Sequence, residues 1–127
     1  MTVTTDENTY TVSEAAALVG LTTYTLRWYE QEGLVDPIDR DTAGRRRYSE
    51  RDLAFLGLLI RLRRTGMSVA DMRRYSELIR SGDDTLRQRL DLFRDHRDQV
   101  LEQIAQLQRD LEAVDMKIKI YEEMVRE

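Results

Sequence analysis

Apolar residues recur at two different spacings along this chain, and the change of spacing divides the chain into two parts. Up to residue 82 they come in short groups separated by glycines, each close to a Ser, Thr or Asp that can cap a helix. This punctuation predicts short helices joined by tight turns. Beyond residue 82 no Gly or Pro interrupts the chain, and apolar residues alternate at spacings of four and three. That spacing predicts one long helix.

Two short helices are expected first. Ser13 is the predicted N-cap of a helix over 14–19, and Gly20 turns the chain. Thr23 is the predicted cap of a second helix, which ends at Gly33. This arrangement fits a helix-turn-helix motif.

Side-chain size and spacing predict which face of the second helix is buried. Ala16 is small enough for the two helices to cross closely, and Leu26 points back into the core. The same spacing sends a mixed aromatic, Arg and amide face outward, made of Tyr24, Arg27, Trp28 and Gln31. Such a face suits a DNA groove. The alternative is that Tyr24 and Trp28 are ordinary packing residues of a small domain.

A small hairpin is expected after the second helix, with strands near 36–38 and 45–48. Pro37 restricts the first of these to an edge. The second carries Arg45, Arg46, Arg47 and Tyr48, whose guanidinium and phenol groups suit DNA phosphates. A run of Arg is more often a solvated turn. Its place directly after a possible recognition helix favours a DNA-binding wing.

Two more helices follow the hairpin. Ser49, with Asp52 three residues later, resembles a capping box and opens a helix that runs to about Thr65. Ser68 caps another helix, which stops near Gly82. These helices complete a small domain.

The last part of the chain has the seam of a coiled coil. All of its twelve seam positions except Arg97 are apolar; the positions are Leu86, Leu90, Phe93, Arg97, Val100, Ile104, Leu107, Leu111, Val114, Ile118, Tyr121 and Val125. A helix of about 40 residues would be about 60 Å long, far longer than the first part can cover. The seam therefore needs a partner, most simply the same helix of a second copy.

Charge is unevenly distributed along the chain. The formal net charge is −4, which taken alone argues against a nucleic-acid partner. Residues 83–127 carry all of that net charge, whereas 40–64 contain eight Arg against three acidic residues. The part that contains the predicted wing is locally basic.

Composition removes several classes of protein. With 127 residues, no Cys and one His, the chain favours a single domain and offers no thiolate, iron–sulfur or His-rich metal site. No stretch approaches the roughly 20 apolar residues of a membrane span, and the polar start lacks the pattern of a secretory signal. We therefore expect a cytoplasmic protein with no membrane partner and no metal or other cofactor.

Four sequence features follow one another along the chain. They are YTVSEAAALVGLTTYTLRWYEQEGL at 10–34, the wing GRRRYSERDL at 44–53, the RRTGMSVADMRR junction at 63–74 and the terminal coil. Together they resemble the mercury-resistance-regulator (MerR) family of bacterial transcription regulators. The resemblance covers nearly the whole chain from Tyr10. It implies a mainly α protein: a winged helix-turn-helix DNA-binding domain followed by a long C-terminal coiled-coil dimerisation helix.

The resemblance also implies partners and a mode of action. The two coils of the homodimer run antiparallel, and the dimer binds a palindrome in an overlong promoter spacer of double-stranded DNA. Bending and untwisting of that spacer lets RNA polymerase engage both promoter elements, so the regulator activates or represses through DNA distortion. Such a protein is bacterial, cytoplasmic and nucleoid-associated.

The resemblance carries contact roles onto particular residues. Arg27 and Trp28, with Tyr29 following, fall in the recognition-helix contact segment, although the family commonly has Tyr in place of Trp28. Arg46 and Tyr48 match wing residues that touch the DNA backbone, with Arg45 and Arg47 as extra basic neighbours. The expected DNA-binding set is Thr23, Tyr24, Arg27, Trp28, Tyr29, Arg45, Arg46, Arg47 and Tyr48. The expected dimerisation set is Leu90, Phe93, Val100, Ile104, Leu107, Leu111, Val114, Ile118 and Tyr121.

The sensor is the open question at this stage. Relatives respond through cysteine thiolates, an iron–sulfur cluster, a reactive cysteine or an appended drug-binding domain, and a chain without Cys cannot use the first three. The most similar branch responds to aldehydes, yet Arg61 stands where that branch carries its cysteine. A small effector pocket lined by Tyr75, Leu78, Ile79 and Phe93 is one hypothesis. Packing in the dimer core is favoured over it, because apolar residues at helical spacing usually pack.

These observations predict three segments: a flexible N-terminus over 1–9, the DNA-binding domain with two following helices over 10–82, and the coiled coil over 83–127. The leading function is a dimeric, sequence-specific transcription regulator. The alternative is a coiled-coil adaptor or scaffold protein without specific DNA recognition. An enzyme is not expected, since no histidine base, Gly-rich phosphate loop or metal constellation is present.

Overall fold

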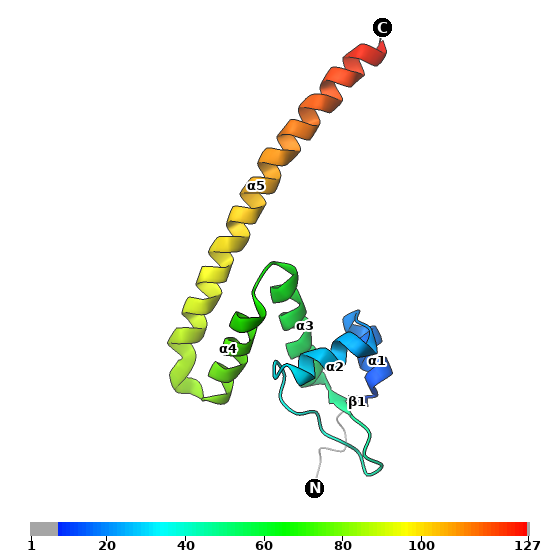
Figure 1. Cartoon of the computed structure of the whole chain (residues 1–127), viewed down its shortest axis with the longest axis vertical. Helices are drawn as coiled ribbons and strands as arrows, with labels where there is room; N and C mark the ends of the chain where they lie inside the picture. Colours follow the sequence, from blue (N-terminus) through cyan, green and yellow to red (C-terminus); the bar gives the residue numbers. More distant parts are fainter. Residues whose placement is uncertain (1–7, 127) are drawn as a thin grey trace. The chain divides into compact units, whose positions relative to one another are not determined.

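The computed structural model describes residues 8–126, which form two compact units that meet between Arg89 and Leu90 (Figure 1). In chain order the elements are β1 (Thr9–Tyr10), α1 (Val12–Val19), α2 (Thr23–Gln31), β2 (Tyr48–Ser49), α3 (Glu50–Arg64), α4 (Val69–Arg80), η2 (Asp83–Thr85) and α5 (Leu86–Arg126). The architecture is mainly helical, with a winged helix-turn-helix followed by a long C-terminal helix. The predicted fold class is confirmed.

The helix-turn-helix begins two residues earlier than predicted. Thr11, and not Ser13, caps α1: its hydroxyl accepts a hydrogen bond from the Glu14 backbone N–H, and the Glu14 carboxylate accepts one from the Thr11 N–H. This reciprocal capping box satisfies two backbone donors, so Thr11 is favoured over Ser13 as the N-cap. Gly20 ends α1 with a φ of 79°, as the predicted turn requires.

The cap of α2 also lies one residue before the predicted position. The Thr22 hydroxyl accepts from the Thr25 backbone N–H, which makes Thr23 the first residue of the helix. Ala16 is 3% exposed and Leu26 is 1% exposed, so the close crossing and the inward-facing leucine are both confirmed. α1 and α2 therefore pack as a helix-turn-helix.

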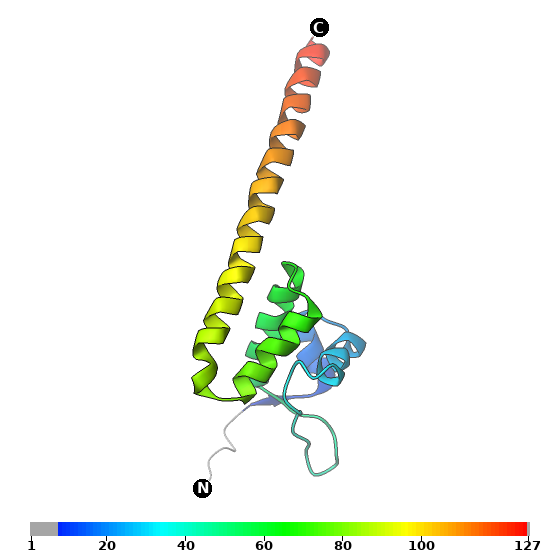
Figure 2. The ribbon, with the colours of Figure 1, turned by 60° about the vertical axis from the view of Figure 1, so that its left-hand side comes forward.

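The wing is present, but its strands pair differently from the prediction. Residues 36–38 form no strand; the wing is instead closed by an isolated bridge between Arg40 and Arg46. Tyr48–Ser49 pairs with Thr9–Tyr10 as an antiparallel two-stranded sheet. In both views the chain between α2 and β2 forms a loop that stands away from the helices (Figures 1 and 2).

The capping box that opens α3 and the Ser68 cap of α4 are both confirmed. Leu56 and Leu59 of α3 and Met72 of α4 have no exposed surface, and they form the centre of the first unit's core. Phe55 stacks on Tyr75 at a centroid distance of 6.0 Å, which joins the two helices. The helices after the wing are thus part of one core with the helix-turn-helix.

The last helix, α5, extends without a break over 41 residues. Its start is tied to the end of the first unit, because Arg89 donates to the Gly82 carbonyl at 2.7 Å and to the Thr85 hydroxyl at 3.0 Å. From Leu101 onward its large apolar residues are 44% to 84% exposed. No helix in residues 8–126 is long and apolar enough to cross a membrane.

The segment boundaries differ slightly from the predicted ones. Residues 1–7 of the predicted flexible terminus lie outside the described residues, whereas Thr9 already belongs to β1 and pairs with Ser49. The compact units meet at residue 89, seven residues after the predicted boundary at 82. The shift arises because Thr85 of η2 donates to the Leu78 carbonyl of α4, and Arg89 of α5 donates to the Gly82 carbonyl just after α4.

Candidate nucleic-acid interface

One face of α2 is open to solvent. Tyr24 is 82% exposed, and Arg27 and Gln31 are exposed one helical turn and two turns further along. Leu26 and Tyr29, on the opposite face, are buried in the core. The outward face predicted for this helix is confirmed, with Trp28 half-buried at its edge.

The tip of the wing is organised by one carboxylate. Asp41 accepts hydrogen bonds from the backbone N–H groups of Ala43 and Arg45 at 2.9 and 3.0 Å, and the Arg45 guanidinium lies 3.3 Å from its second oxygen. These bonds, the Arg45 N–H first among them, lower the pKa of Asp41 from its usual range. Gly44 completes the turn with a φ of 82°. The wing is therefore a defined turn stabilised by an ionised aspartate.

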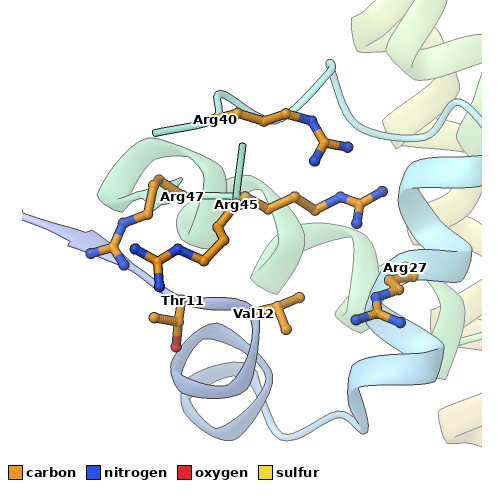
Figure 3. A pocket seen from close by; sticks show the side chains of 7 residues that line it. Thr11, Val12, Arg27, Arg40, Arg45 and Arg47 are labelled. Carbon is orange, nitrogen blue, oxygen red and sulfur yellow. The ribbon is translucent and has the colours of Figure 1, made fainter. Parts of the chain in front are cut away.

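The wing and α2 enclose a basic cavity of about 360 Å³ (Figure 3). Arg27 approaches it from α2, and the start of α1 forms its floor through Thr11 and Val12. Its lining is Thr11, Val12, Arg27, Arg40, Arg45, Arg46 and Arg47. Five guanidinium groups gathered from two elements make a surface suited to the phosphates of a nucleic-acid backbone.

Arg46 joins the wing to α2. Its Nε lies 2.8 Å from Oε1 of Glu30, and both side chains are less than one third exposed. The two atoms make an ion pair without the alignment of a hydrogen bond. Arg47 reaches the other way and donates to the hydroxyl and carbonyl of Thr9, both at 3.1 Å. The two arginines therefore brace the wing against α2 and β1.

Tyr29 and Tyr48 were expected to contact DNA, whereas the structure places both rings in the core of the first unit. Tyr29 is 3% exposed and Tyr48 is 1% exposed, and burial raises the pKa of both phenols. The Tyr48 hydroxyl is enclosed near Glu30 and Arg46 and has no hydrogen-bond partner among the described residues. Both rings pack in the core. Thr23, another expected contact, is half-buried.

Sequence reasoning missed three participants in this surface. Arg40 lines the basic cavity, although it was counted only as part of a basic stretch. Glu30 holds Arg46, and its place three residues after Arg27 on α2 is a signal that could have found it. Arg63 lies over the Trp28 ring at 4.7 Å, a contact between distant parts of the chain that no local pattern shows.

A second cavity, of about 410 Å³, lies beside α3 and α4 in the first unit. Of the four residues expected to line an effector pocket, only Ile79 borders it. Tyr75 is stacked on Phe55, and Phe93 belongs to the second unit. The lining is Leu34, Val35, Asp36, Arg51, Asp52, Phe55, Ser76, Ile79 and Arg80. It mixes apolar and charged groups more than the predicted set does.

Comparison with known proteins extends these findings. Residues 10–78 match the model of the MerR HTH family regulatory proteins, and residues 53–115 match the MerR DNA-binding model. An HTH-type transcriptional regulator of Haemophilus influenzae is 43% identical over 114 residues, which are 90% of this chain and 84% of that protein. The regulator AdhR of Bacillus subtilis is 33% identical over 91 residues, 72% of this chain and 65% of its own length.

Solved structures agree with the sequence comparison. The structure of HiNmlR, a MerR family regulator lacking the sensor domain and bound to promoter DNA, has a TM-score of 0.85 and 42% identity, and the match covers 91% of this chain and 92% of that one. A MerR family transcriptional regulator from Bacillus thuringiensis has a TM-score of 0.80 at 28% identity, covering 87% and 97%.

The fold and its basic surface define a winged helix-turn-helix DNA-binding protein. The matches are to transcriptional regulators and not to enzymes. The chain belongs to the MerR family, and it is a DNA-binding transcription regulator. The alternative of a coiled-coil adaptor without DNA recognition is not supported.

Proposed function

We propose that this regulator binds a palindromic promoter operator as a homodimer, with the exposed face of α2 in the major groove and the wing on the backbone. The observation that carries the proposal is the basic cavity, which is lined by Arg27 of α2 and by four wing arginines. In sequence-specific DNA recognition, contacts to base edges in a groove read the sequence, and contacts to phosphates position the protein. A helix in the groove beside a phosphate-binding wing supplies both. HiNmlR, which is similar over most of its length, is bound to promoter DNA in its crystal structure.

The proposal assigns different roles to the exposed residues. Tyr24 and Arg27 meet base edges and nearby phosphates, because they lie on the open face of α2. Arg45 and Arg47 meet the backbone from the wing, and Arg46 contributes its charge while it is held by Glu30. Thr23 and Trp28 flank the contact, and Tyr29 and Tyr48 support it from the core.

Dimerisation through α5 is the second part of the proposal. The exposed fractions of the seam residues Leu107, Leu111 and Ile118 are 67%, 56% and 50%. A heptad seam that is open in one chain is stabilised by burial against another helix. The antiparallel direction of the two helices is carried over from the family resemblance. The expected interface is Leu90, Phe93, Val100, Ile104, Leu107, Leu111, Val114, Ile118 and Tyr121.

We propose the family's mode of action for this chain as well. Binding in a promoter spacer distorts the DNA, and RNA polymerase responds to the changed spacing of its contacts. The deformation costs a few kcal/mol, which many phosphate contacts from two chains can offset. The site of action is the nucleoid in a bacterial cytoplasm, as for a transcription regulator with bacterial relatives.

Two substitutions test the DNA-binding surface. Arg46→Ala is expected to weaken binding to all sequences and to make the salt dependence shallower, because it removes a backbone-directed cation. Arg27→Ala is expected to weaken binding and to reduce the preference for the operator over random DNA. Arg109→Ala, on the exposed surface of α5, is the matched control. Fluorescence anisotropy at several salt concentrations measures all three. Wild-type affinity in both variants would refute the surface.

A small-molecule effector is a second prediction that the cavity of about 410 Å³ supports. Its lining combines apolar side chains, such as Leu34, Phe55 and Ile79, with charged groups such as Arg51, a combination typical of sites for small amphipathic molecules. Calorimetric titration with candidate effectors is expected to release heat and to change operator affinity. Absence of both responses would leave the cavity as a packing feature.

A further inference from the structure

The one tryptophan of the chain lies between a buried ring and an exposed cation. Tyr29 meets the Trp28 ring edge-to-face, with centroids 5.1 Å apart and planes at 78°. On another side the guanidinium carbon of Arg63 lies 4.7 Å from the indole centroid. Since Tyr29 is buried, the indole is anchored to the core while it holds Arg63 near the surface.

Arg63 comes from outside the helix-turn-helix and the wing. It lies in the last turn of α3, whereas Trp28 lies on α2 beside Arg27. The exposed α2 face of Tyr24, Arg27 and Gln31 has Trp28 at its edge, so a guanidinium held over Trp28 extends this face. The cation–π contact is thus a bridge from α3 to the DNA-facing helix.

Among residues 8–126, no carboxylate neutralises the charge of Arg63. Arg45 and Arg46 are ion-paired with Asp41 and Glu30, whereas within residues 8–126 no carboxylate forms an ion pair with Arg63. A ring face attracts a guanidinium through its quadrupole and leaves the N–H edges available for other acceptors. Arg63 therefore retains both its charge and its donors for a phosphate.

We propose that Arg63 is a further DNA-backbone contact, and that Trp28 is the positioning residue that holds it there. The inference rests on the DNA-binding surface proposed above. It also gives a reason for Trp where the family commonly has Tyr. Among side chains, the indole is the strongest cation–π partner, and in this role it acts on DNA through Arg63 and not through its own donor.

The first test compares Arg63→Gln with Arg64→Gln. Arg64 is the adjacent exposed arginine, and it lines a different groove with Leu18 and Gly57, so it is a matched control for loss of charge. The probe is a duplex that the wild-type protein selects from a random library. Arg63→Gln is expected to make the slope of log K against log salt shallower by about 0.9 for each chain bound. Equal slopes for the two variants would overturn the proposal.

The second test separates positioning from packing. Trp28→Leu is expected to lower the salt slope as Arg63→Gln does, and the double variant is expected to be no weaker than either single variant. Trp28→Phe keeps a ring face and is expected to lose only about 2- to 5-fold in affinity. If Trp28→Leu does not fold, as circular dichroism would show, Trp28→Phe and Arg63→Gln decide the matter. A salt slope that Trp28→Leu leaves unchanged would make Trp28 a packing residue only.

Trp28 also supplies a signal of its own, since it is the only tryptophan. Its fluorescence in the free protein is expected to change in Arg63→Gln and to stay as in the wild type in Arg64→Gln. An unchanged spectrum in Arg63→Gln would contradict the cation–π contact.

The Arg27→Ala result separates failure of the proposed DNA-binding surface from failure of the role proposed for Arg63. If that variant binds like the wild type, the proposed surface fails. If it weakens binding while Arg63→Gln does not, only the present inference fails.

Discussion

The two units of this chain differ in how far their helices bury apolar side chains. In the first unit Leu26, Leu34 and Leu56 are at most 1% exposed. In the second unit Leu107 and Leu111 are 67% and 56% exposed, although the helix that carries them is unbroken. A single helix cannot bury its own apolar stripe, so its stability comes from packing against something else. The first unit therefore has its core within one chain, whereas the apolar stripe of the second is exposed in the single chain, as the proposed dimerisation requires.

Charge follows the same division. The −4 of the whole chain lies in residues 83–127, while the wing and α2 collect five arginines around one cavity. Acidic residues on α5 repel phosphates, and basic residues on the first unit attract them. Net charge alone would have misrepresented the partner of this protein.

The largest expected effect comes from a charge in the exposed seam. Leu107→Asp should convert the proposed dimer into monomers and reduce operator affinity by roughly 10²-fold, because two linked half-site contacts become independent. Analytical ultracentrifugation and anisotropy measure the two effects. Gln108→Asp adds the same charge beside the seam and should leave the dimer intact. A dimeric Leu107→Asp protein would show that the seam is not the interface.

A truncation in the first unit should act on stability instead. Leu56 has no exposed surface, so Leu56→Ala should lower the free energy of unfolding by about 2–5 kcal/mol through lost burial and a cavity. The dimer should persist in the folded fraction. Denaturant unfolding followed by circular dichroism gives the energy, and a loss below ~1 kcal/mol would contradict the buried position.

Removing the acid that braces the wing should have a smaller effect. Glu30→Gln breaks the ion pair with Arg46. The Glu30 side chain is 18% exposed and the Arg46 side chain is 27% exposed, so the loss should lower the free energy of unfolding by about 1 kcal/mol. Affinity for random DNA should rise a few-fold, since one negative charge leaves the basic surface. Thermal unfolding and anisotropy test both statements. Weaker binding to random DNA would mean that Glu30 matters for positioning more than for charge.

The smallest effect concerns the wing turn at acid pH. The pKa of Asp41 is lowered from its ordinary value of 3.8, so its ionised form stabilises the fold. That contribution is complete above pH 3.8 and is lost as the pH falls through the lower folded-state pKa. NMR titration should show the amide signals of Ala43 and Arg45 moving together below about pH 4. In Asp41→Asn this joint movement should be absent.

Much of the fold follows from local patterns in the sequence. The capping box at Ser49, the Ser68 cap, the Gly20 turn and the seam of α5 each depend on residues within a few positions of one another. Local interactions of this kind are readable from a single sequence. The misplaced cap of α1 was also readable, because Thr11 precedes Glu14 by three residues.

The errors lie where distant residues meet. β1 and β2 are two residues each and pair Thr9 with Ser49, so no strand pattern reveals them. Tyr48 sits beside three arginines in the sequence, and only the packing of the core shows that its ring turns inward. Arg63 and Trp28 meet across two helices. Burial and long-range contact were thus the missing information for the DNA-facing surface.

The pairing of β1 with β2 affects where a purification tag can be attached to this protein. The hydroxyl and carbonyl of Thr9 accept both hydrogen bonds from Arg47, so β1 forms the root of the wing. A purification tag fused directly before Asn8 would begin beside that root, within reach of the basic cavity. Tags for binding assays therefore belong at the other end of the chain, joined after Arg126.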